Sequence, residues 1–197
     1  MKALTEKQKR KKKLEILQAA TRVLSKCGFD ALTMDEVAKE AGLAKGTLFL
    51  YYRHKEDLIL AVFSAMAKSL GKTLRTIISA GLPPEETLKR TILSLLEHFD
   101  KKRDMTGYSG GLPLAGPRKE PLHLLFAANM EAIAAVLGSC AKAGLLRLED
   151  PLFAASALFG LCRGSNSYAR AIGHKLPAEE RTRRITGIFL DGARKHK

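Results

Sequence analysis

Residues Thr33 to Leu58 read TMDEVAKEAGLAKGTLFLYYRHKEDL, two short helical patterns on either side of Ala41-Gly42-Leu43. The first pattern begins with Thr33 and Glu36 in the order T-x-x-E, which is typical of a capping box because each side chain accepts a hydrogen bond from the other residue's backbone amide. Gly42 supplies the backbone freedom that a sharp turn between two helices needs. We therefore predict a helix-turn-helix, the shape of a DNA-reading element.

The second helix of this pair is expected from about Ala44 to Tyr52. At about 100° per residue, Leu48 and Tyr52 fall on one side of it, and the other side carries Gly46, Thr47 and Leu50. We expect the first side to pack against the protein and the second to be free for contact with a partner.

The chain here resembles the TetR family of transcriptional regulators, whose signature is similar to G-x3-T-T-x3-I-A-x2-A-G-V-S-x-G-T-L-Y-x-Y-F-x2-K-E-x-L. The positions in register with it are Gly28, Thr33, Val37-Ala38, Ala41-Gly42-Leu43, Gly46-Thr47-Leu48, Tyr51 and Lys55-Glu56-x-Leu58. The resemblance implies an all-α fold, with an N-terminal three-helix domain that contains the helix-turn-helix and a larger helical domain for ligand binding and dimerisation.

Two departures from the signature affect DNA affinity. Ala44 stands where the family often has a capping serine, and loss of such a cap typically costs ~1 kcal/mol. Phe49 stands where tyrosine is common, and it cannot donate a hydroxyl to a phosphate. We expect affinity to depend more on Thr47, Tyr51, Lys55 and the N-terminal arm.

Geometry and resemblance together assign individual contacts. Lys45, Gly46 and Leu50 are the expected neighbours of base edges, since lysine donates to guanine, glycine allows close approach and leucine meets a thymine methyl. The expected phosphate anchors are Thr33, Thr47, Tyr51 and Lys55. Simple packing is the alternative for Tyr51, and it is the interpretation we adopt for Tyr52.

The net charge of +14 is unevenly distributed. Residues 1–13 hold seven bases and one acid, residues 14–60 are nearly neutral, and the remainder is again positive. We expect the basic arm to be a flexible or frayed extension of the first helix that neutralises phosphates or lies along a minor groove. A merely solubilising tail is the alternative.

Length and composition fit one small and one medium domain, since the chain has 197 residues of which 46% are hydrophobic. We assign residues 1–13 to the arm, 14–58 to the DNA-binding domain and 59–197 to the ligand-binding and dimerisation domain. No secretory signal and no run of ~18 uninterrupted apolar residues is present, so a soluble, cytoplasmic protein without membrane contact is expected. Three widely spaced cysteines predict neither disulfides nor a zinc site. Cys27 is expected to be a small buried hydrophobe.

Beyond Leu58 the pattern is helical throughout. We predict a long helix over 58–78, a second one opening with Glu85 and Glu86, and an irregular loop over 107–121 that suits a ligand portal or lid. Further helices are predicted over 122–140, over 151–172 and from Glu179 onward, the last with Ile185, Ile188 and Phe189 inward. The resemblance implies a homodimer through the last two helices, which places one helix-turn-helix on each half-site of an inverted repeat in double-stranded DNA, roughly 34–36 Å apart.

A small-molecule inducer would bind inside the larger domain. The apolar candidates for its site are Phe63, Met66, Phe99, Met105, Tyr108, Phe126, Met130 and Phe159. The polar candidates are Asn129, Arg163 and Asn166, of which the last two lie one turn apart and have a bond across the dimer as the alternative. Ordinary core or surface is the alternative for every member of both sets.

Enzymatic interpretations find little support. The five histidines form no H-E-x-x-H or other metal-ligand spacing, and the letters G-L-A-K-G-T at residues 42–47 are in the wrong order for a phosphate loop. We expect no cofactor, no metal and no catalysis. The sequence predicts a ligand-responsive repressor released from its operator by an inducer, with an assembly protein anchored on DNA without any effector as the alternative.

Overall fold

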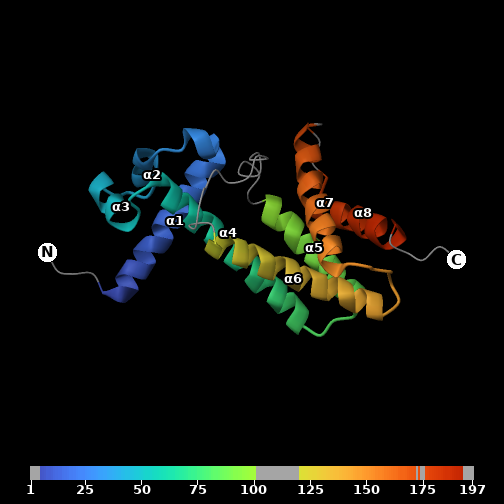
Figure 1. The fold of residues 1–197 in the computed structure, drawn as a ribbon. Coiled ribbons are helices and arrows are strands. Elements are labelled where there is room, and N and C mark those ends of the chain that lie inside the picture. The colour runs from blue at the N-terminus through green and yellow to red at the C-terminus, as the bar shows by residue number, and fades with distance from the viewer. Residues whose placement is uncertain (1–4, 101–119, 172, 174–175, 193–197) are drawn as a thin grey trace.

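The computed structural model describes residues 5–100, 120–171, 173 and 176–192. Over these residues the chain has eight α-helices and no strand, which confirms the all-α prediction. A small group of helices lies at one end of the molecule and a larger group at the other, and α4 joins them (Figure 1).

The small group consists of α1 (Glu6–Ala31), α2 (Met34–Glu40) and α3 (Lys45–Tyr51). Its core is built from the apolar faces of these helices and the start of α4, with Ile16, Ala20, Val23, Leu24, Leu32, Val37, Ala38, Leu48, Tyr52, Leu58, Ile59 and Val62 buried. We call this set the first core. Leu48 and Tyr52 lie in it as the helical period predicts.

Two features of α1 differ from expectation. Residues 6–13 of the predicted basic arm are part of a regular helix with a capping box at Thr5, so this part of the arm is not frayed, and residues 1–4 lie outside the described ranges. Cys27 is exposed rather than buried. Gly28 has a φ of 77° and interrupts the helix directly after Cys27, so Cys27 stands at the end of the regular part of the helix, where its periodic face is not continued.

The larger group contains α4 (Lys55–Ser79), α5 (Pro84–Asp100), α6 (Glu120–Lys142), α7 (Pro151–Ala171) and α8 (Ala178–Gly192). The predicted helices are thus confirmed to within a few residues. The predicted loop over 107–121 is wrong at its end, since α6 already begins at Glu120, and residues 107–119 lie outside the described ranges. The second core, as we call it, contains Leu70, Leu74, Leu88, Ile92, Leu95, Leu96, Phe99, Met130, Ile133, Leu137, Cys140, Leu158, Cys162 and Ile185 among others.

Helix α4 belongs to both cores. Its N-terminal half buries Leu58, Ile59 and Val62 in the first core, and its C-terminal half buries Leu70 and Leu74 in the second. Because a helix is stiff over this length, a displacement of its C-terminal half moves the helix-turn-helix as well.

Helix α6 is apolar enough to pass a test for membrane spans over Pro121–Lys142, with a window of mean hydropathy 1.7. One such helix is weak evidence for a membrane span, because core helices of soluble proteins pass the same test. Helix α6 has 39% of this window buried inside the protein. It packs against α4, α5 and α7, and Ile133 and Leu137 are completely buried in the second core.

Helices α5 and α8 are joined by a buried ion pair. The Arg181 Nη2 atom lies 2.5 Å from Asp100 Oδ2, and the arginine side chain is only 3% exposed. Its Nε and Nη1 atoms are buried without a hydrogen-bond partner among the described residues. The sequence pattern did not single out this pair.

The face of α8 also differs from expectation. Ile185 is buried and Phe189 packs against the second core, but Ile188 is 61% exposed and points outward. Helix α8 therefore carries one apolar side chain, Ile188, that lies outside the second core.

Candidate nucleic-acid interface

The capping box at the start of α2 is present as predicted. The Glu36 amide donates to Thr33 Oγ1 at 3.2 Å, and the Thr33 amide donates to Glu36 Oε2 at 3.2 Å. The Thr33 hydroxyl also donates its proton to Glu36 Oε2 at 3.0 Å. Thr33 is exposed, but its hydroxyl must release Glu36 before it donates to a phosphate.

The turn between α2 and α3 depends on Gly42. Its φ of 64° lies in the left-handed region, which a residue with a Cβ rarely adopts. The Leu43 amide then donates to the Ala38 carbonyl at 2.9 Å and closes the turn. This geometry fixes the angle at which α3 leaves α2.

Helix α2 is held against α1 by Glu40. The Glu40 carboxylate accepts hydrogen bonds from Arg22 at 2.6 Å and from Lys26 at 3.2 Å. The bond from Arg22, followed by that from Lys26, lowers the pKa of Glu40. Helices α1 and α2 are therefore joined by ion pairs on the outside as well as through the first core.

Helix α3 presents the predicted base-reading residues to solvent. Leu50 is 85% exposed, an unusual position for a large apolar side chain, and Lys45 and Gly46 are exposed beside it. A Cβ on Gly46 would meet no atom within 4 Å, so the protein's own packing does not require glycine there. Thr47 is half-buried, and Ala44 provides no side-chain cap, as predicted.

Lys45 has a partner that the sequence pattern did not indicate. Its Nζ atom lies 2.8 Å from Asp35 Oδ1. Both side chains are exposed to solvent, that of Lys45 at 61% and that of Asp35 at 63%. Exposed pairs of this kind contribute only about 0–1 kcal/mol, so DNA can displace the carboxylate easily. Asp35 nevertheless fixes the direction of the lysine across the α2–α3 turn before any partner arrives.

Tyr51 and Tyr52 lie in different environments. Tyr51 is half-buried and packs against the first core, so it is both anchored and partly accessible. Tyr52 is buried, and its Oη atom has no hydrogen-bond partner among the described residues. Burial raises the pKa of Tyr52 to about 12. The packing role that we predicted for Tyr52 is therefore present, but with an unsatisfied hydroxyl.

Lys55 connects the interface to the end of α1. Its Nζ atom donates to the Asp30 carbonyl at 3.1 Å. The residue is half-buried at the start of α4, directly after the reading helix. This geometry fixes the position of Lys55, and its contact with phosphate stays a prediction.

The predicted effector residues do not form one cluster. Phe63 and Met66 pack against the first core, whereas Phe99, Met130 and Phe159 belong to or pack against the second. Phe159 makes edge-to-face contacts with Phe99 at a centroid distance of 5.0 Å and with Phe126 at 5.5 Å. Met105 and Tyr108 lie outside the described residues.

The polar candidates in the larger domain are mostly engaged by the backbone. Asn129 on α6 donates to the Ala67 carbonyl of α4 at 3.0 Å, and Asn166 on α7 donates to the Phe99 carbonyl of α5 at 3.1 Å. Both residues are buried and tie helices together, while Arg163 is half-buried on α7. Among the described residues, no group of three or more His, Cys, Asp or Glu side chains is arranged to hold a metal ion.

Two family models match the chain. Residues 16–62 match the model of bacterial regulatory proteins of the tetR family, and residues 121–189 match the C-terminal domain of an AefR-like transcriptional repressor. The first match covers the helix-turn-helix, and the second covers α6, α7 and most of α8.

Curated relatives agree with the first match. The chain is 35% identical over 96 residues to the HTH-type transcriptional regulator YhgD of Bacillus subtilis (strain 168), an alignment that covers 49% of each chain. It is 40% identical over 57 residues to the fatty acid metabolism regulator protein of the same organism, covering 29% of each chain. The chain thus spans half or less of the length of these relatives.

Solved structures show the same fold over nearly the whole chain. The fatty acid degradation regulator FadR from Bacillus halodurans superposes with a TM-score of 0.79 at 19% identity, covering 99% of this chain and 100% of that one. FadR from Bacillus subtilis, solved in complex with stearoyl-CoA, gives 0.76 at 17% identity and covers 91% of this chain and 98% of that one. At this identity the likeness concerns the fold.

Proposed function

Because the chain belongs to the TetR family of transcriptional regulators, we propose that it is a sequence-specific repressor that binds an inverted-repeat operator as a homodimer and is released by a small-molecule inducer. One observation carries the DNA-reading part of this proposal. Leu50, Gly46 and Lys45 are exposed together on a helix whose opposite side, through Leu48, is completely buried. An exposed leucine beside a glycine and a lysine matches the apolar and hydrogen-bonding features of a major groove.

The proposed dimer uses the outer faces of α7 and α8. Phe153 is 74% exposed, and Leu161 and Tyr168 follow it along α7 at helical spacing, with Ile188 exposed on α8. The small residues Ala157, Gly160 and Gly164 are also exposed on α7, and a Cβ at either glycine would meet nothing within 4 Å. A large apolar surface interleaved with small residues suits close packing against a second copy of the same helices.

For the inducer we propose an apolar molecule with a chain or ring system that lies against Phe99, Phe126 and Phe159. These three rings form a continuous row from the half-exposed Phe126 on α6 to the buried Phe99 on α5. The names of similar proteins support this class of ligand, since one was solved with stearoyl-CoA and another is a ketosteroid transcriptional regulator. The protein would act in the cytoplasm, without a cofactor or catalytic activity.

The proposed signal passes through α4. Asn129 joins α6 to α4 at Ala67, between the last first-core residue of α4, Val62, and its first second-core residue, Leu70. A ligand that displaces α6 would therefore move α4 at the point between the two cores and change the separation of the two reading helices. The extent of release is limited by the difference in ligand affinity between the two states.

Selection of bound duplexes from a random DNA library, at near-physiological salt, tests the DNA-reading proposal. We expect enrichment of an inverted repeat. We expect the Leu50→Ala variant to lose its base preference at particular positions of this repeat. Enrichment of no sequence would refute sequence-specific regulation. If the selected operator is bound but no fatty acid, acyl-coenzyme A or steroid releases the protein, the effector part of the proposal is wrong and the effector-free assembly protein is favoured.

A further inference from the structure

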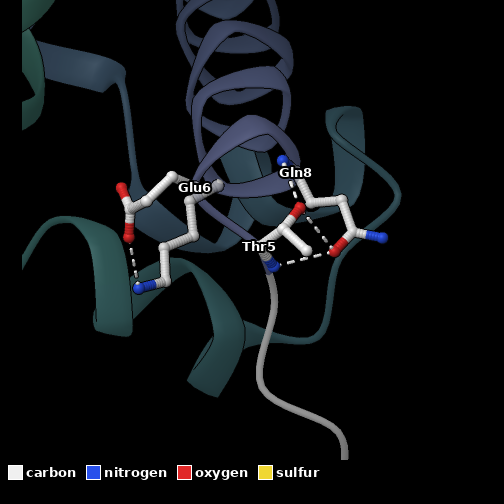
Figure 2. A network of polar contacts seen from close by, with 4 residues as sticks. Thr5, Glu6 and Gln8 are labelled. Carbon is white, nitrogen blue, oxygen red and sulfur yellow. Dashed lines mark hydrogen bonds and ion pairs between the residues drawn. The ribbon is translucent and has the colours of Figure 1, made fainter.

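The first two turns of α1 carry a dense positive charge. Residues 6–13 read EKQKRKKK, with six bases and one acid. They are held in a helix by a capping box: the Gln8 amide donates to Thr5 Oγ1 at 3.3 Å, and the Thr5 amide donates to Gln8 Oε1 at 2.8 Å (Figure 2). The charged segment therefore has a defined direction and is not a free tail.

This helical segment lies beside the reading helix. The Lys13 Nζ atom is 5.7 Å from the centroid of the Tyr52 ring, at the C-terminal end of α3. Lys9, one turn earlier, forms an ion pair with Glu6 of its own helix. The contact of Lys13 therefore places this part of α1 next to the end of α3, where Tyr51 also lies, the tyrosine that we expect at the DNA backbone.

Three cations of this segment form no ion pair within the part of the chain that the structure describes. Lys7, Arg10 and Lys11 are exposed and form no ion pair with any residue in the described ranges, whereas Lys9 pairs with Glu6 and Lys12 with Glu15. Positive charge at a helix N-terminus opposes the helix dipole, and like charges four residues apart repel each other. These three residues therefore disfavour the helix that carries them unless an external anion lies nearby.

We propose that residues 6–13 form a helical phosphate-binding arm, which contacts the DNA backbone next to the phosphate reached from Tyr51. Lys7, Arg10 and Lys11 supply the contacts, and the cap at Thr5 and the contact of Lys13 with Tyr52 set the direction of the arm. The arm adds affinity by counterion release and carries no sequence preference. The inference rests on the proposed function only in that α3 must approach DNA.

The test is the salt dependence of DNA affinity in the triple variant Lys7→Gln/Arg10→Gln/Lys11→Gln. Glutamine keeps a helix propensity close to that of lysine and arginine, so the arm should still fold, which far-UV circular dichroism verifies. Each phosphate contact contributes about 0.9 to the slope of log K against log salt, so three contacts from each of the two arms of a dimer contribute about 5.4. Between about 50 and 200 mM salt, the unmodified protein should therefore lose roughly 2,000-fold more affinity than the variant.

A matched control removes three charges elsewhere. Lys68→Gln/Lys72→Gln/Lys142→Gln changes three exposed lysines of α4 and α6 and should leave the slope unchanged. An equal decrease of the slope in both triple variants would mean that overall charge is measured, and it would overturn the proposal. An unchanged slope in the arm variant would identify the arm as a solubilising tail.

Two duplexes separate this proposal from the proposed function. The arm variant should show the same decrease in the slope of log K against log salt on a selected operator and on an unrelated duplex. If no operator can be selected, sequence-specific regulation fails while the unrelated duplex still tests the arm. A loss of affinity confined to duplexes with A·T-rich flanks would show minor-groove reading and overturn the phosphate assignment.

Discussion

Replacing Gly71 on α4 by alanine should destabilise the protein, although alanine is the better helix former. A Cβ at position 71 would lie 2.6 Å from Asn129 Oδ1 and 3.3 Å from Arg75 Nη1, and the first distance is shorter than Cβ atoms adopt. Asn129 would have to move, and with it the hydrogen bond from its amide to the Ala67 carbonyl at 3.0 Å. Asn129 is buried, so its amide finds no water in exchange.

The magnitudes decide the sign of this effect. Gly-to-Ala replacement within a helix gains about 1 kcal/mol from propensity. A buried amide left without its partner costs about 1–3 kcal/mol, and overpacking typically costs a further ~1–3 kcal/mol. We expect a net loss of about 1–5 kcal/mol in the free energy of unfolding.

The matched control is Gly138→Ala on α6. A Cβ at Gly138 would meet nothing within 4 Å, so this replacement should stabilise the protein by up to ~1 kcal/mol. Urea unfolding followed by circular dichroism measures both changes, at one fixed protein concentration because dimer stability depends on it.

A double-mutant cycle identifies the cause. In an Asn129→Ala background the clashing oxygen is gone, so Gly71→Ala should become neutral or stabilising. If Gly71→Ala alone stabilises the protein as much as Gly138→Ala, or if its effect is the same with and without Asn129, the close contact between Gly71 and Asn129 does not limit the packing of α4 against α6.

Three further predictions concern single side chains. Tyr52→Phe removes the unpartnered buried hydroxyl and should stabilise the protein by about 1 kcal/mol in urea unfolding at neutral pH. Since the folded pKa of about 12 exceeds the unfolded value of about 10, the stability linked to Tyr52 is complete below about pH 10 and decreases above it, so the advantage of Tyr52→Phe should grow at about pH 11. In a panel of operator variants, Lys45→Ala should weaken the preference for particular bases, whereas Tyr51→Phe should weaken binding to all duplexes by the same factor. Equal losses of affinity across the panel for Lys45→Ala would contradict its assignment as a base-reading residue. Arg181→Met removes the buried ion pair between Arg181 and Asp100 and should lower the free energy of unfolding by about 3 kcal/mol, while Arg183→Met, at an exposed position of the same helix, should leave it unchanged. Equal stability of the two variants would refute the importance of the buried pair.

Local sequence patterns were sufficient for the helices and for the faces of α3. The Thr33–Glu36 capping box spans three residues, and the burial of Leu48 and Tyr52 follows from the helical period within one element. Such features depend on neighbours in the sequence, so one sequence predicts them. Cys27 shows the limit of the same reasoning: the helical period puts it on the apolar face of α1, but it stands at the last regular position before the interruption at Gly28 and is exposed.

Pairings between helices could not be predicted in this way. Lys45 meets Asp35 ten residues away, and Arg181 meets Asp100 across 81 residues. Each of these residues has the sequence signature of an ordinary exposed charge. Their partners depend on the angle at which two helices cross, which the periodic pattern of neither helix contains.

Asn129 shows how such a pairing changes the functional interpretation of a residue. As a polar residue in an apolar helix it was a reasonable candidate for an inducer contact, yet its amide donates to the Ala67 carbonyl, 62 residues away. That carbonyl and Gly71 lie where α4 passes from the first core to the second, and the absence of a side chain at Gly71 lets Asn129 approach. In the proposed mechanism, a residue that joins α6 to α4 at this point would transmit the response to an inducer without touching it. The DNA affinity of the ligand-free protein should therefore be measured for any Asn129 variant before a loss of response is attributed to ligand binding.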